Sequence, residues 1–98
     1  MTFADGVAVR EPDAAALDII RRGAERIVEV SDEEIAAAIR IVFSDTHTAA
    51  EGAGAASLAA VMKERDRLQG RKIAVILTGQ NIDRPCMATI LAGGTPPV

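Results

Sequence analysis

Aromatic residues are almost absent from this sequence, which has no tryptophan, no tyrosine and two phenylalanines among its 98 residues. A hydrophobic core must therefore be built from alanine, valine, isoleucine and leucine. Positive charge is also scarce, since 11 basic residues face 14 acidic ones and the net charge is −3. This balance argues against a nucleic-acid partner. No apolar segment approaches the roughly 20 residues that span a bilayer, so no membrane partner is expected.

Cysteine and histidine are each represented once, by Cys86 and His47. A single cysteine excludes an internal disulfide, and the N-terminal residues lack the layout of a signal peptide, so we expect a cytoplasmic protein. No second histidine or cysteine accompanies His47 to form a metal site, and no metal is expected. Without a positioned partner, His47 is interpreted as a residue that orients a helix end rather than as an acid or base. A chain of this length is one small domain or part of a larger one.

The most informative stretch is Lys72–Asp83, which reads KIAVILTGQNID. Its apolar run without alternation is typical of a strand buried on both faces of a parallel sheet. Ligands in such sheets bind beyond the carboxyl ends of the strands, which directs attention to Thr78 and the residues that follow it. The alternative is that Thr78 only satisfies backbone groups in an ordinary turn.

The remaining pattern alternates helices with short extended segments. Residues 7–9 and 26–30 read as extended, Asp13 can cap a helix that closes at Gly23, and Ser31 with Glu34 forms a capping box before a second helix. Further helices are predicted from residue 52 and from residue 84. Strands and helices in this order indicate an α/β fold.

The glycines near Glu51 do not form a dinucleotide fingerprint. In Gly52-Ala53-Gly54-Ala55-Ala56-Ser57 a serine replaces the third glycine, and the preceding segment reads as helix. Small residues here instead allow a helix to approach a neighbouring backbone closely. Glu51 itself, at the start of this helix, reads first as an ordinary N-terminal cap.

Four segments carry a resemblance to a known family. Leu77–Asp83 resembles the S-G-G-N-I-D turn of the threonine and serine dehydratases, and Thr2–Val9 resembles their T-x-A-D-G-x-A-V segment. Val30–Ile35 matches V-S-D-E-E-I, and Asp45–Ala56 matches the form D-T-H-x-x-A-E-G-A-G-A-A. The chain therefore resembles the pyridoxal-phosphate enzymes of fold type II, which form the tryptophan synthase beta-like family.

The resemblance implies an α/β fold in which residues 1–98 are the C-terminal part of the large, cofactor-binding domain, with helices packed on a parallel sheet. It implies pyridoxal 5'-phosphate as cofactor and places Thr78 opposite the pyridine nitrogen, with Gly79, Gly6 and Glu51 on the cofactor side. A neutral hydroxyl at Thr78 would permit an uncharged ring. Gln80 departs from the glycine found in many relatives.

No lysine in the chain fits the family's Schiff-base motif, since Lys63 lies in a charged helix end and Lys72 at the entry of the predicted strand. We therefore assign no catalytic residue and expect this chain alone to be inactive. The complete enzyme, a dimer by resemblance and of the short catabolic type, would convert L-threonine or L-serine to a 2-oxo acid and ammonia. The alternatives are a serine racemase-like isomerase fragment and a non-catalytic binding module. With few predicted strands, we expect the isolated chain to expose apolar surface and associate.

Overall fold

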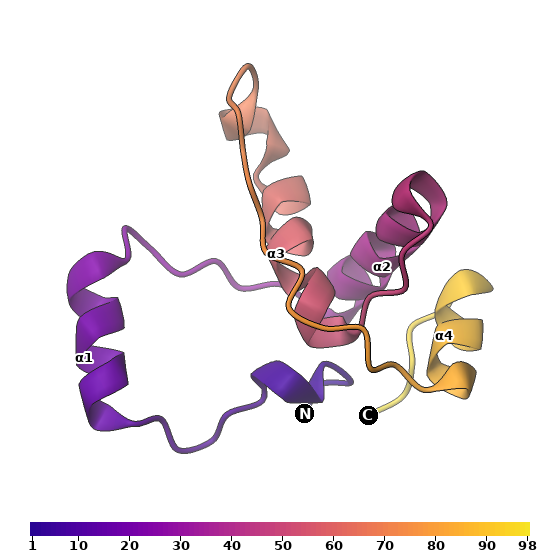
Figure 1. Cartoon of the computed structure of the whole chain (residues 1–98), viewed down its shortest axis with the longest axis horizontal. Coiled ribbons are helices and arrows are strands. Elements are labelled where there is room, and N and C mark those ends of the chain that lie inside the picture. Colours follow the sequence, from indigo (N-terminus) through magenta and orange to yellow (C-terminus); the bar gives the residue numbers. More distant parts are fainter.

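The computed structural model describes all of residues 1–98 and is built from helices joined by extended segments (Figure 1). No helix is both long and apolar enough to cross a membrane. The molecule is flat, with extents of 40 × 36 × 18 Å. The elements in chain order are η1 (Asp5–Val7), α1 (Ala14–Gly23), α2 (Asp32–Thr46), α3 (Gly52–Lys63), η2 (Arg65–Leu68) and α4 (Arg84–Leu91).

Helix α1 stands apart from the other helices (Figure 1). Its start is fixed locally, because the Asp13 carboxylate accepts a hydrogen bond of 2.9 Å from the backbone N–H of Ala16. None of its residues is buried, and Ile19 and Ile20 are exposed. The predicted helix is therefore confirmed, but its apolar side has no partner within the chain.

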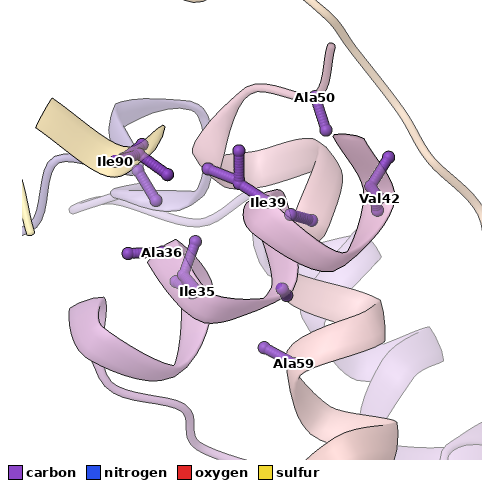
Figure 2. Packing of buried hydrophobic residues seen from close by; sticks show 10 residues of the cluster. Ile35, Ala36, Ile39, Val42, Ala50, Ala59 and Ile90 are labelled. Atoms are coloured by element: carbon purple, nitrogen blue, oxygen red, sulfur yellow. The ribbon is translucent and has the colours of Figure 1, made fainter. Parts of the chain in front are cut away.

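Helices α2 and α3 pack against each other and contribute most of the core (Figure 2). The predicted capping box at the start of α2 is confirmed, since Ser31 and Glu34 each accept a hydrogen bond from the other's backbone N–H. Ile39 of α2 and Ile90 of α4 are the largest fully buried side chains. Small residues complete the cluster, whose buried members are Ala4, Ile35, Ala36, Ala38, Ile39, Val42, Ala50, Ala55, Ala59 and Ile90.

Helix α2 ends where His47 adopts a left-handed conformation, with φ of 57°. The backbone N–H of His47 donates to the carbonyl of Phe43, and the ring Nδ1 lies 3.3 Å from the same oxygen. Left-handed residues commonly close helices, although glycine is the usual choice. His47 therefore occupies a helix end, as its structural interpretation predicted.

The predicted α/β fold with a parallel sheet is wrong for this structure, because no residue forms a strand. Residues 72–79 run beside α3 without regular structure, and none of their N–H groups donates to a backbone carbonyl. The backbone N–H groups of residues 26–30 likewise donate to no backbone carbonyl. Val7 and Ala8 are not extended, because their N–H groups close the turn of η1. A strand requires a hydrogen-bonded neighbour, and no backbone hydrogen bond joins these segments to one another.

The segments that were predicted as strands expose their apolar side chains. Ile76 is 77% exposed and Ile27 is 74% exposed, and Val9, Ile73 and Val75 are exposed as well. The predicted exposure of apolar surface is thus confirmed, whereas association of the chain stays a prediction.

Two isoleucines in opposite environments test this description of the core. Replacement of buried Ile39 by alanine (I39A) is expected to lower the free energy of unfolding by about 2–5 kcal/mol, because it leaves a cavity between α2 and its neighbours. The matched change at exposed Ile76 (I76A) should cost about 0.5 kcal/mol or less. Urea unfolding followed by circular dichroism measures both, and equal losses would contradict the assigned core.

The stability of the chain should also depend on pH through Glu34. Its hydrogen bond from the Ser31 backbone, aided by Lys63, lowers the pKa of the Glu34 carboxyl. A carboxyl whose pKa is lower in the folded state stabilises the fold above its ordinary pKa, and this contribution is lost as the pH falls through the folded-state value. Glutamine can keep the capping box without titrating. When the free energy of unfolding is measured at decreasing pH, E34Q should therefore lose less stability than the wild type. E33Q, at the exposed neighbour, serves as the control and should lose as much stability as the wild type.

Candidate functional site

The candidate site lies where the start of α3 meets the segment that follows Thr78. The backbone N–H of Glu51 donates a 3.1 Å hydrogen bond to the carbonyl of Gly79. Six residues later the hydroxyl of Ser57 donates a 3.0 Å bond to the carbonyl of Ile76. These two bonds hold residues 76–79 along α3.

Glycine lies on both sides of this contact. A Cβ atom on Gly54 would overlap the carbonyl oxygen of Gly79, and a Cβ atom on Gly79 would overlap the carboxylate of Glu51. A larger residue at position 54 would push the two backbones apart, whereas one at position 79 would displace the Glu51 side chain. The predicted close approach of this helix to a neighbouring backbone is therefore confirmed.

The same helix is approached from its other side by the N-terminal residues. A Cβ atom on Gly52 would lie 2.7 Å from the Cβ of Ala4, and one on Gly6 would lie 2.8 Å from the Cβ of Ala53. Gly6 lies in the tight turn of η1, which the N–H of Val7 closes on the carbonyl of Ala4, and it has no positive φ there. Its lack of a side chain serves the packing of η1 on α3 instead.

Glu51 does not act as the ordinary cap that its position suggests. It is the N-cap residue of α3, but its side chain accepts no capping hydrogen bond. Its carboxylate lies over Gly79 instead. This orientation brings together two of the residues assigned to the cofactor side by resemblance, Glu51 and Gly79.

The other two residues lie nearby but apart from this contact. Thr78 precedes Gly79, and its side chain is exposed. Gly6 packs against the first turn of α3. The structure therefore brings Gly79 and Gly6 into contact with the start of α3, whereas the Thr78 side chain is exposed.

A cavity of about 690 Å³ opens beside this contact. It is bounded by the N-terminal residues, the start of α3, the segment before α4, α4 itself and the C-terminal residues. Three carboxylates line it, from Asp5, Glu51 and Asp83, and no lysine, arginine or histidine does so. The other lining residues are Thr2, Phe3, Gly52, Asn81, Ile82, Pro85, Cys86, Thr89, Pro96, Pro97 and Val98.

Several of these lining residues were not predicted from the sequence. Asp5 and the C-terminal Pro96–Val98 come from opposite ends of the chain, so no local pattern could place them together. Cys86 lies in the cavity wall, where burial and, to a smaller extent, Asp83 raise the pKa of its thiol. The thiol is therefore kept in its protonated form, which is a poor nucleophile.

Comparison with known proteins gives consistent matches. The sequence profile of the family described as "Pyridoxal-phosphate dependent enzyme" matches residues 1–79. The chain is 39% identical over 82 residues to "L-threonine ammonia-lyase" of Thermotoga maritima, which covers 84% of this chain and 20% of that protein. It is 37% identical over 94 residues to "L-threonine ammonia-lyase" of Geobacter sulfurreducens, covering 96% and 23%.

A third relative is "Phenylserine dehydratase" of Ralstonia pickettii, which is 32% identical over 94 residues and is covered for 29% of its length. The chain thus spans between about a fifth and three tenths of the length of these relatives. These matches confirm the resemblance found in the sequence motifs.

The glycine contact can be tested with three substitutions. G54A is expected to lower the free energy of unfolding by about 1–3 kcal/mol, because its methyl group meets the rigid carbonyl of Gly79. G79A meets the flexible Glu51 side chain, so its cost should be smaller and should largely disappear in a background that carries E51A. G23A, which meets nothing within 4 Å at the end of α1, should stabilise by about 0.5–1 kcal/mol.

Chemical unfolding of the three alanine variants and of the E51A/G79A double variant gives the comparison. If G79A lowered the free energy of unfolding by the same amount with and without E51A, the contact between Gly79 and the Glu51 carboxylate would be contradicted.

Proposed function

The chain belongs to the family of pyridoxal-phosphate dependent enzymes, and we propose that it forms part of an ammonia-lyase acting on L-threonine or L-serine. The observation that carries this proposal is the match of 84% and 96% of the chain to two proteins named L-threonine ammonia-lyase. The complete enzyme would release a 2-oxo acid and ammonia. A small hydroxy amino acid is accordingly the substrate class that we propose.

The residues of this chain fit only one side of a pyridoxal-phosphate site. Thr78 offers a hydroxyl without a partner, next to a glycine backbone that lies close to α3. The cavity carries three carboxylates and no cationic side chain, which is unfavourable for a phosphate group. A cofactor phosphate would therefore need a binding loop from elsewhere.

The Schiff-base lysine is also missing from the site. Lys63 donates a 2.8 Å hydrogen bond to the carbonyl of Glu29 and pairs with Glu34 at 3.2 Å, so its amine is already engaged. Lys72 is exposed and does not line the cavity. We derive no catalytic step from either lysine.

We accordingly assign residues 1–98 to the C-terminal part of the cofactor-binding domain. In this assignment Thr78 would hold the pyridine nitrogen of the cofactor, and its uncharged hydroxyl would make the ring a weaker electron sink than an acidic partner would. Gly79, Gly6 and Glu51 shape the wall beside it. When bound, the cofactor supplies the electron sink for loss of the β-hydroxyl group. A homodimeric complete enzyme and a cytoplasmic location stay predictions.

A chimera tests the proposal directly. The matching segment of the Thermotoga maritima relative is replaced by this chain, and the chimera is assayed for 2-oxo acid formation from L-threonine and for the absorbance of bound cofactor. We expect turnover in the chimera. T78V should lower kcat by about tenfold to a hundredfold through loss of one hydrogen bond in a desolvated site, whereas T78S should retain most activity.

The isolated 98-residue chain provides the complementary measurement. Mixed with pyridoxal phosphate and treated with borohydride, it should form no stable adduct on one lysine. A specific reduced adduct on Lys63 or Lys72 would contradict the proposal. An inactive chimera, together with binding of L-threonine to the isolated chain in calorimetry, would favour the binding module, and racemisation of L-serine by the chimera would favour the isomerase.

A further inference from the structure

Arg40 joins α2 to the end of α4 across a large distance in the sequence. One guanidinium nitrogen donates hydrogen bonds of 3.2 Å to the carbonyl of Ile90 and of 3.2 Å to the carbonyl of Gly94. Arg40 takes part in none of the ion pairs of the molecule. Its charge is therefore directed at backbone carbonyls rather than at a carboxylate.

The end of α4 is well suited to receive a cation. Gly93 has a φ of 95°, its N–H donates to the carbonyl of Ile90, and the N–H of Gly94 donates to the carbonyl of Thr89. The last carbonyls of a helix carry a partial negative charge, which a nearby guanidinium stabilises. Arg40 thus completes this helix end from outside the helix.

The position of Arg40 is itself fixed by the core. Its neighbour Ile39 is fully buried and lies beside Ile90 of α4 (Figure 2). The Arg40 side chain is partly buried. Since both ends of the connection rest on packed isoleucines, the guanidinium has little freedom to move away from the helix end.

The hydrogen bond to Gly94 is the last one along the chain. No backbone or side-chain hydrogen bond involves residues 95–98. Yet Pro96 is buried, and Pro96–Val98 form one wall of the cavity that also contains Glu51 and Cys86. Gly94 is therefore the last hydrogen-bonded residue before this wall.

We propose that Arg40 is a positioning residue, which holds the C-terminal wall of the cavity in place through the carbonyls of Ile90 and Gly94. Removal of its guanidinium releases residues 95–98 and opens the cavity, while the packing of α2 on α3 remains. The role concerns the shape of the cavity and can be measured without turnover.

Cys86 reports on the wall because it lies in the same cavity and is the only thiol. Its rate of reaction with a thiol reagent such as dithionitrobenzoate is measured in the 98-residue chain at constant pH. R40M should accelerate the reaction about tenfold, since it removes two charge-assisted hydrogen bonds that hold the wall. R40K, which keeps one donor group, should accelerate it less than about threefold. R71M, at an exposed arginine, should leave the rate unchanged.

Two further variants separate a local opening from a general loss of fold. In a C86S background, a cysteine placed by A59C reports on the buried contact of α3, and R40M should not accelerate its reaction. In a chain that ends at Gly94 the wall is absent, so Cys86 should react rapidly and R40M should add nothing.

Three results would overturn the proposal. One is an unchanged Cys86 rate in R40M with intact helical circular dichroism. The second is an equal acceleration at the A59C reporter, and the third is a full additional effect of R40M in the chain that ends at Gly94.

Discussion

The close approach of the Gly79 backbone to the first turn of α3 is the contact on which the candidate site depends. No side chain separates the two backbones, because Gly54 and Gly79 face each other and the N–H of Glu51 donates to the Gly79 carbonyl. This contact determines where the chain continues toward α4 and therefore where the cavity forms. It also leaves the neighbouring Thr78 side chain exposed.

The helices could be predicted from the sequence because their ends are local. Asp13 and the pair Ser31 and Glu34 act within one helical turn, so the residues that set the boundary are neighbours in the sequence. The family could also be identified from short motifs in the correct order. Both conclusions needed no knowledge of which distant segments meet.

The presence of a sheet could not be predicted in the same way. An apolar run such as Ile73–Leu77 shows that a segment favours burial, but pairing depends on a second segment at the correct distance and direction. In this chain no such neighbour is present, and Ile76 remains exposed. The orientation of Glu51 and the role of Arg40 were missed for a related reason, since both depend on residues that are remote in the sequence.

Electrostatics explains how the chemistry would be divided between this chain and the rest of an enzyme. The carboxylates of Asp5, Glu51 and Asp83 line a cavity without a cation, so a phosphate group would be repelled there. The neutral hydroxyl of Thr78 and the glycine backbone beside it suit an uncharged aromatic nitrogen instead. Lys63 is already bound to Glu29 and Glu34, and Lys72 does not line the cavity, so no lysine amine faces an aldehyde there. This division agrees with the function we propose, in which this chain would hold the ring side of the cofactor while another segment binds the phosphate and forms the covalent bond.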